Sequence, residues 1–238
     1  MSMIRKTVLS ALVGAATLAG CQGGGFDAAQ SAPLNTDDEK ASYAIGMQIG
    51  TSLEPAGDHV QMGSFLRGIQ DAMGGKDPAI PQDSLQAVLQ RFTMMMQQEE
   101  QAKTAESADK NQKDGAAFLA ENGAKPGITT TGSGLQYEVM RAAEGPKPTA
   151  ADMVTIHYRG KLIDGTEFDS SYGRGEPTSF SVGGVIPGFS EALQLMPVGS
   201  QYRFFIPGEL GYGAQGNGQQ IGPNATLIFE VELLKIGQ

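Results

Sequence analysis

The sequence predicts an α+β protein, in which an all-helical N-terminal domain and a long connecting helix precede an antiparallel β-sheet wrapped on a short helix. Two patterns along the chain lead to this expectation. In the first half, apolar residues recur every three or four positions, which is the period of a helix with one apolar face. From Leu135 onward they alternate with polar residues, which is typical of strands with one buried face.

Residues 1–20 have the pattern of a secretory signal peptide. Arg5 and Lys6 precede an apolar run that is too short to span a membrane as a helix. The run ends in Leu18-Ala19-Gly20-Cys21, which resembles the lipobox of bacterial lipoproteins, where the cysteine carries the lipid and becomes the mature N-terminus. The sequence therefore predicts lipidation at Cys21. An ordinary signal peptide with a chance cysteine, or a short anchor helix, is the alternative.

A lipidated cysteine would place the chain in the bacterial cell envelope. Gln22 lacks the acidic character linked to retention in the inner membrane. This favours the outer membrane, facing the periplasm, and display on the cell surface stays open. Residues 21–35 begin with a glycine run and continue with polar residues, so they are predicted to form a flexible tether.

Residues 36–80 are predicted to form a helical dimerisation domain. Thr36 and Glu39 fit a capping box at the start of a first helix, and a second helix ends at Gly74-Gly75. The apolar stripes of the two helices consist of Ile45, Ile49 and Leu53, and of Phe65, Leu66, Ile69 and Met73. Helices this short cannot enclose their own stripes, so we expect a homodimer whose helices complete one core. A small monomeric bundle is the alternative.

Residues 81–123 are predicted to form a long connecting helix, from about Gln82 to Asn122. Its apolar stripe ends early and consists of Leu85, Val88, Leu89, Phe92, Met95 and Met96. The remainder is polar on all sides, which predicts a solvated strut. Gly115 weakens the expectation of an unbroken helix.

Residues 124–238 are predicted to form the sheet domain. Asp164-Gly165 indicates a tight turn between two strands, and Pro187 to Leu193 has the pattern of the start of a short helix. The residues that alternate on the buried faces of the strands are Leu135, Tyr137 and Val139, then Val154, Ile156 and Tyr158, and finally Leu227, Phe229, Val231 and Leu233.

Composition excludes several kinds of function. A formal net charge of −9 argues against nucleic acid as a partner, because phosphate binding needs a basic face. The single cysteine excludes an internal disulfide and a cysteine-based zinc site. The two histidines, His59 and His157, do not suffice for a His-rich metal centre. We therefore expect neither a metal nor a cofactor.

Five motifs in the C-terminal half occur in the order of a known family. They are Val154-Thr155-Ile156-His157-Tyr158, Gly165-Thr166-Glu167-Phe168-Asp169-Ser170-Ser171, Val185-Ile186-Pro187-Gly188-Phe189, Gly211-Tyr212-Gly213, and Ala225 to Leu233. Together they resemble the FKBP-type peptidyl-prolyl cis-trans isomerases over about residues 127–236. The segment Asp38 to Gly46 resembles the start of the dimerising domain of macrophage infectivity potentiator-like proteins. The resemblance implies an enzyme that isomerises X–Pro bonds and assists the folding of envelope proteins.

The resemblance also implies which residues form the site. Tyr158, Phe168 and Phe229 would form aromatic walls, and Phe189 would form the floor. Further sides would come from Phe180, Val185, Ile186 and Ile221. The Ile186 N–H and the Tyr212 hydroxyl would hold substrate carbonyls. Asp169 would orient the twisting amide, and Arg174 is expected to pair with Asp169. Without the motifs, the aromatic residues read as core and Asp169 as a solvated acid.

Two positions depart from the family pattern. Phe189 stands where many members have tryptophan, and Asn217 lies in the loop after Tyr212 that shapes the pocket rim. Both bear on substrate preference and on the binding of macrolide inhibitors. The expected partners are proline-containing unfolded or nascent envelope proteins and a second copy of the chain. Two other functions stay open: a proline-docking chaperone with little isomerase activity, and a surface interaction protein.

Overall fold

The computed structural model describes residues 32–218 and 220–237, so Cys21, the signal peptide and most of the tether lie outside the described residues. The chain divides into two units, one ending at Ala79 and one starting at Ile80. Each unit is described by itself.

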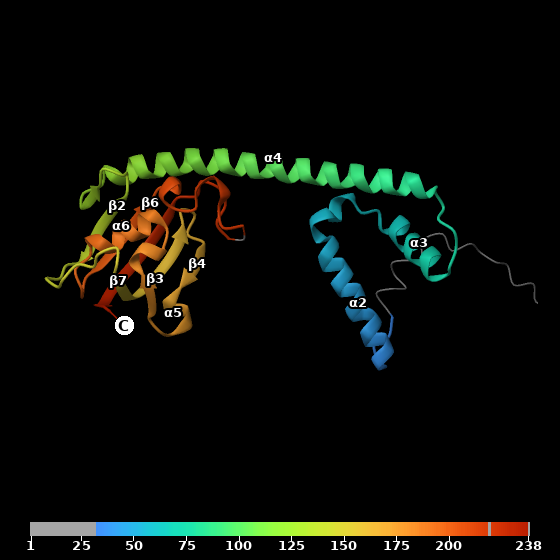
Figure 1. Cartoon of the computed structure of the whole chain (residues 1–238), viewed down its shortest axis with the longest axis horizontal. Coiled ribbons are helices and arrows are strands. Elements are labelled where there is room, and N and C mark those ends of the chain that lie inside the picture. The colour runs from blue at the N-terminus through green and yellow to red at the C-terminus, as the bar shows by residue number, and fades with distance from the viewer. Residues whose placement is uncertain (1–31, 219, 238) are drawn as a thin grey trace, which may run out of the picture. The chain divides into compact units, whose positions relative to one another are not determined.

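The first unit contains two helices and a short connecting turn (Figure 1). They are α2 (Asp37–Leu53), η1 (Glu54–His59) and α3 (Met62–Met73). The predicted capping box is confirmed, because the Glu39 N–H donates to Thr36 Oγ1 at 3.2 Å and the Thr36 N–H donates to Glu39 Oε2 at 2.8 Å. Gly74 caps α3, and Gly75 follows with a φ of 64°, a conformation that favours glycine. Neither α2 nor α3 contains a buried residue.

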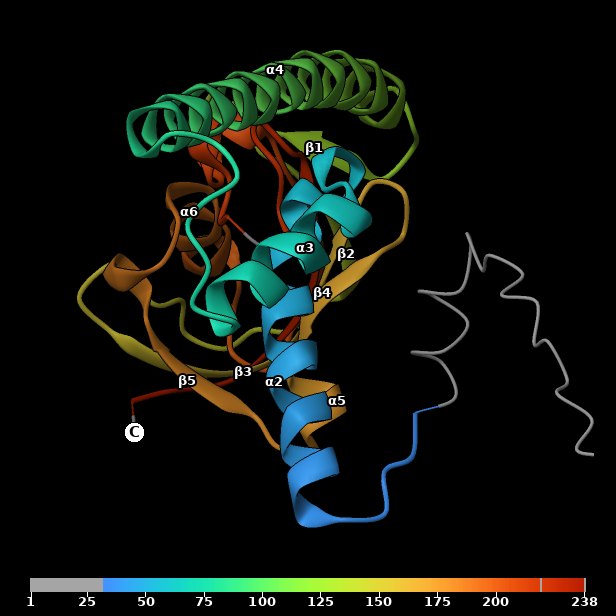
Figure 2. The same ribbon diagram turned by 90° about the vertical axis from the view of Figure 1, so that its right-hand side faces the viewer.

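The second unit starts with α4 (Gln82–Gly123), which is one unbroken helix through Gly115. The prediction of a long helix is confirmed, but the prediction that its polar half is a solvated strut is wrong for the last three turns. Figures 1 and 2 both show this end of α4 against the sheet. Gly115 is buried there, and a Cβ at this position would lie 2.3 Å from Thr226 Oγ1. Glycine therefore allows a close approach that any side chain would obstruct.

Four further contacts fasten α4 to the sheet domain. Asn111 Nδ2 donates to the Pro223 carbonyl at 2.9 Å, and the Phe118 ring lies 5.9 Å from the ring of Phe205. The buried side chains of Asn122 and Gln136 are joined by a hydrogen bond of 2.9 Å. Gln136 Nε2 also donates to the Leu119 carbonyl at 2.8 Å. The polar composition of this part of the helix therefore includes buried, hydrogen-bonded side chains.

Seven antiparallel strands form the sheet, with α6 (Pro187–Leu195) packed on it. The strand order is β1-β2-β6-β7-β3-β4, and β5 pairs with β3. The strands are β1 (Ile128–Thr130), β2 (Gln136–Arg141), β3 (Met153–Leu162), β4 (Glu167–Ser170), β5 (Thr178–Ser181), β6 (Gln201–Ile206) and β7 (Leu227–Ile236). Short helices α5 (Ser171–Arg174), η2 (Val182–Gly184), η3 (Gly208–Leu210) and η4 (Gly213–Gln215) connect them. The predicted antiparallel sheet on a short helix is confirmed.

The predicted alternation of buried and more exposed side chains is confirmed in β3 and β7, where Val154, Ile156, Val231 and Leu233 are fully buried. It is wrong for Val139, whose side chain is 44% exposed. Strand β1 pairs with β2 only as far as Glu138, and a register shift follows Val139, so the end of β2 leaves the covered part of the sheet. The predicted turn between β3 and β4 is present, with Gly165 at a φ of 91°.

Candidate active site

A pocket of about 510 Å³ opens between β3, β4, β5, the start of α6 and the loop after Tyr212. Its size lies in the usual range for ligand sites. The lining consists of Tyr158, Phe168, Asp169, Phe180, Gly184, Val185, Ile186, Phe189, Tyr212, Asn217, Ile221 and Phe229. The structure thus brings together all the predicted site residues of the sheet domain except Arg174, which is not among the lining residues but contacts one of them, Asp169. Gly184 was not predicted.

Aromatic rings form the apolar part of the pocket. Phe189, in the first turn of α6, is only 4% exposed and its ring lies 4.7 Å from the ring of Phe229. The rings of Tyr158 and Phe180 each lie 6.5 Å from that of Phe189. Edge-to-face packing at these distances holds the rings in fixed orientations. The rings therefore form a rigid apolar cup rather than a collapsible one.

Gly160 makes room for this cup, and sequence reasoning missed it. A Cβ at Gly160 would lie 2.6 Å from the Phe168 ring and 2.9 Å from that of Phe229. The two rings pack edge-to-face at 5.5 Å across this position. A glycine inside a strand indicates the close approach of another group, so the isolated Gly160 in β3 was an available signal.

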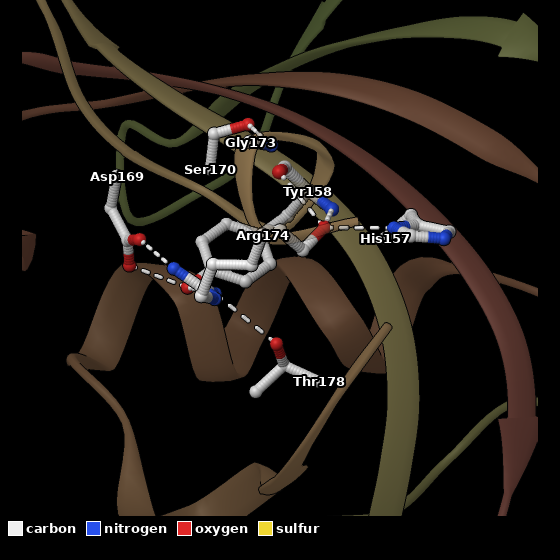
Figure 3. A network of polar contacts seen from close by, with 8 residues as sticks. His157, Tyr158, Asp169, Ser170, Gly173, Arg174 and Thr178 are labelled. Carbon is white, nitrogen blue, oxygen red and sulfur yellow. Dashed lines mark hydrogen bonds and ion pairs between the residues drawn. The ribbon is translucent and has the colours of Figure 1, made fainter. Parts of the chain in front are cut away.

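Polar groups gather on one wall (Figure 3). The Tyr158 hydroxyl donates to Asp169 Oδ2 at 2.5 Å, and Arg174 Nη1 donates to Asp169 Oδ1 at 2.6 Å. Arg174 Nη2 also donates to the Tyr158 hydroxyl at 2.9 Å and to Thr178 Oγ1 at 3.2 Å. The predicted Asp169–Arg174 pair is therefore present. The polar role of Tyr158 was missed, because the family motif identified this residue only as an aromatic wall.

These contacts set the charge of the wall. Burial alone would raise the pKa of the Asp169 carboxyl, but hydrogen bonds from Tyr158 and Arg174 and the positive charge of Arg174 hold that pKa below its usual value. Burial, followed by the hydrogen bond to Asp169, raises the pKa of the Tyr158 phenol. Asp169 is therefore ionised and Tyr158 is neutral at physiological pH.

Ser171 ties this wall to the sheet. Its buried hydroxyl accepts from the Tyr158 N–H at 2.8 Å and donates to the Tyr158 carbonyl at 3.2 Å. The same hydroxyl lies 2.9 Å from His157 Nδ1. The His157 ring stacks on Tyr172 at 4.7 Å, and neither residue lines the pocket. This placement agrees with the expectation that His157 points away from the site.

The loop after Tyr212 forms another part of the pocket lining. Asn217 Oδ1 accepts from the backbone N–H groups of Gln220 and Ile221, at 3.0 and 2.8 Å. Gly216 has a φ of 62°, and a Cβ there would lie 2.3 Å from the Ile221 carbonyl oxygen. These contacts fold the loop so that Ile221, only 2% exposed, faces the pocket beside the half-exposed Tyr212.

Two further searches concern only the described part of the chain. In residues 32–218 and 220–237, no group of three or more His, Cys, Asp or Glu side chains is placed to hold a metal ion. None of the helices in the same residues has the length and apolar character needed to cross a bilayer.

Comparison with known proteins assigns the family. Residues 145–234 match the family described as "FKBP-type peptidyl-prolyl cis-trans isomerase", and residues 38–139 match the "Domain amino terminal to FKBP-type peptidyl-prolyl isomerase". The FKBP-type 22 kDa peptidyl-prolyl cis-trans isomerase of Escherichia coli is 46% identical over 208 residues, which cover 85% of this chain and 97% of that protein. The outer membrane protein MIP of Legionella longbeachae is 41% identical, over 88% of this chain and 90% of that protein.

A solved structure extends this likeness to the fold. The crystal structure of FkpA from Escherichia coli, 35% identical, superposes with a TM-score of 0.66 and covers 86% of this chain and 99% of that chain. Sequence, pocket and fold therefore agree: the chain belongs to the FKBP-type peptidyl-prolyl cis-trans isomerases.

Proposed function

We propose that the pocket holds the prolyl ring of an X–Pro segment and lowers the barrier to rotation about its peptide bond. That barrier is about 18–20 kcal/mol and arises from amide resonance. In the twisted transition state the amide loses resonance and becomes less dipolar, so an apolar pocket favours it over water. Each tenfold acceleration needs only about 1.4 kcal/mol of differential stabilisation. No covalent step is required.

One observation carries this proposal: an apolar cup of aromatic rings has a single charged side chain, Asp169, in its wall. Both carboxylate oxygens of Asp169 are engaged, by Tyr158 and Arg174, and the carboxyl remains ionised. We propose that Asp169 acts as a fixed negative charge that orients the twisting amide, not as a proton donor. The Ile186 N–H and the Tyr212 hydroxyl hold the flanking carbonyl oxygens.

Two substitutions test these roles. Tyr212→Phe and Asp169→Leu should each lower kcat/KM for a short X–Pro peptide at least about tenfold, which corresponds to about 1.4 kcal/mol. The assay should be protease-free, so that digestion of a destabilised variant is not mistaken for a loss of activity. Tyr172→Phe is the matched control, because Tyr172 stacks on His157 outside the pocket. Parental activity in both site variants, with an unchanged circular dichroism spectrum, would show that the assigned polar roles are wrong.

The helices of the first unit favour an association function. Apolar side chains project from α2 on more than one side, with Tyr43, Ile45 and Met47 each more than half exposed. Exposed apolar side chains gathered on one helix favour contact with other protein surface. We propose that two chains join through α2 and α3, which would hold two pockets over one client protein. Sedimentation of the full chain as a dimer at micromolar concentration is the expected result, and a monomer would exclude this arrangement.

The same surface supports the alternative function, a chaperone that holds unfolded chains. If holding contributes, the dimer should accelerate proline-limited refolding of a protein more, per pocket, than separate isomerase units do. On a tetrapeptide, which occupies one pocket, both forms should be equal per active site. Equal rates in both assays would mean that the first unit only associates and positions the enzyme.

Location in the cell envelope rests on the N-terminal segment and on the relatives. A relative from Legionella is named an outer membrane protein, and the lipobox-like Cys21 lies outside the described residues. We propose a protein lipidated at Cys21 in the outer membrane, acting on proline-containing unfolded envelope proteins. Cys21→Ser should abolish incorporation of labelled fatty acid, and labelling of the variant would contradict this assignment.

Binding of a macrolide should compete with binding of a peptide substrate, since Phe189 keeps the pocket floor apolar.

A further inference from the structure

We propose that a groove between α4 and the loop after Tyr212 binds the extended polypeptide next to the proline. This inference rests on the proposed function of the adjoining pocket. The groove encloses about 350 Å³. Its lining on the helix side is Glu100, Lys103, Thr104 and Ser107, and on the loop side it is Gln215, Gly218, Gln220, Ile221, Gly222 and Pro223.

The helix side of the groove is a single face of α4. The four lining residues follow a spacing of three, one and three, so they lie side by side on the helix surface. All four are exposed although they face the loop. The space between helix and loop is therefore open to solvent, and polar groups are available there for a ligand.

The groove adjoins the active-site pocket. Ile221 lines both the pocket and the groove, so the loop is a thin wall between them. Tyr212 and Asn217 face the pocket, whereas Gln215 and Gln220 face the groove. A polypeptide that leaves the pocket over this loop would therefore lie beside the groove, and an extended chain covers about 3.3–3.6 Å per residue.

The groove is also held in shape before a ligand arrives. Asn111 of α4 donates to the Pro223 carbonyl, and Asn217 accepts from two backbone N–H groups of the loop. The close contact of Gly115 with Thr226 keeps α4 against the domain just beyond the groove. A site of this kind loses less conformational entropy on binding than a mobile loop would.

The lining selects the class of ligand. Gln215 and Gln220 offer both amide donors and acceptors, and Thr104 and Ser107 offer hydroxyls. Glu100 and Lys103 contribute one charge of each sign, which favours neither a polyanion nor a polycation. Such a surface matches the main-chain amides and polar side chains of an unfolded polypeptide. The groove would therefore add affinity for protein-sized substrates without changing the rotation step.

The test compares substrate lengths in the full chain. A tetrapeptide and two dodecapeptides share one X–Pro core, and polar residues extend the dodecapeptides on the N-terminal or the C-terminal side. In the parent enzyme one dodecapeptide should have a KM at least about threefold lower than the tetrapeptide, at equal kcat. Thr104→Arg fills the groove and should remove this advantage while leaving the kinetics of the tetrapeptide unchanged.

Ala102→Arg is the matched control. Ala102 is exposed and lies two residues before Thr104, on the opposite side of α4, so it receives the same charge outside the groove. This variant should keep the length advantage. The double variant Thr104→Ala/Ser107→Ala removes groove contacts without adding bulk, and it should raise the KM of the favoured dodecapeptide alone. If Thr104→Arg disturbs the loop and lowers activity toward the tetrapeptide, the double variant replaces it as the test of the groove.

Two results would contradict the proposal that the groove binds substrate. One is equal KM values for all three peptides in the parent, and the other is a length advantage that survives in the double variant. Neither result would affect the assignment of the pocket, which depends on parental activity toward the tetrapeptide. If all peptides are inert in the parent, the proposed function itself fails.

Discussion

The two units of this chain bury their apolar side chains to very different degrees. In the sheet unit, Val154, Leu193, Phe204 and Leu227 are completely buried. In the first unit, neither α2 nor α3 contains any buried residue, and Ile45 is 59% exposed. Both units have apolar residues at regular periods. The difference teaches that the period of a pattern tells which face must be covered, but not which chain covers it.

Helix α4 shows both behaviours within one element. Near its start, Val88 and Leu89 are exposed at 45% and 63%, although they form a regular apolar stripe. Near its end, the polar residue Asn122 is buried against Gln136. Burying one large apolar side chain stabilises by about 1.5–3 kcal/mol, so the uncovered stripe favours association with other protein surface.

The largest expected effect is a loss of stability when the part of α4 that packs on the sheet is removed by truncation. A fragment starting at Lys125 loses Phe118 and Asn122, which leaves Phe205 uncovered and Gln136 without its partners. Lost packing and an unpaired buried amide should together cost about 4 kcal/mol. Urea unfolding should therefore give a much lower midpoint than for a fragment starting at Ala108. Equal midpoints would mean that α4 is not part of the sheet unit.

The next effect concerns the first unit. Ile45→Asp places a charge on the exposed apolar face of α2 and should weaken association at least about 100-fold, or about 2.7 kcal/mol. Gln48→Asp makes the same charge change at a polar position and should leave the dimer intact. Sedimentation equilibrium measures both, and activity toward a tetrapeptide should not change. If both variants remain dimeric, the apolar face of α2 is not the association surface.

A smaller effect is expected at Gly115. Gly115→Ala gains helix propensity of about 1 kcal/mol, but its Cβ collides with Thr226, at a cost of about 1–3 kcal/mol. The variant should be destabilised by about 1 kcal/mol. With Thr226→Ala in the background, the same substitution should become stabilising. Thermal unfolding of the four proteins in this cycle measures the coupling, and additive changes would exclude the collision.

The smallest effect is electrostatic and confined to the pocket wall. The pKa of Asp169 in the folded protein lies below its ordinary value. The ionised carboxylate therefore stabilises the fold when the pH is above that ordinary pKa. This contribution is lost as the pH falls through the folded-state pKa. Because the side chain is 42% exposed, the contribution should stay below about 1 kcal/mol. The stability difference between parent and Asp169→Asn should therefore shrink as the pH falls below the ordinary pKa of an aspartate, about 3.9. A constant difference would contradict an Asp169 whose pKa is held low.

Much of the site was predictable because the family motifs are local in sequence. Tyr158, Phe168, Asp169 and Phe229 line one pocket as the order of the motifs implied. The hydrogen bonds from Tyr158 and Arg174 to Asp169 cross between β3, β4 and α5, so only the pairing of these elements sets their geometry. The catalytic roles of these residues remain predictions.

By itself, the sequence determined the element types: the helical period before Met96, the strand period after Leu135, the capping box at Thr36 and the turn at Gly165. These features depend on residues within a few positions of one another. Only the tertiary structure decided that the polar end of α4 packs on the sheet and that Val139 is exposed. Such outcomes depend on contacts between distant segments, as between Gly115 and Thr226. The free energy of those contacts depends on how closely two surfaces approach, and no local pattern encodes that distance.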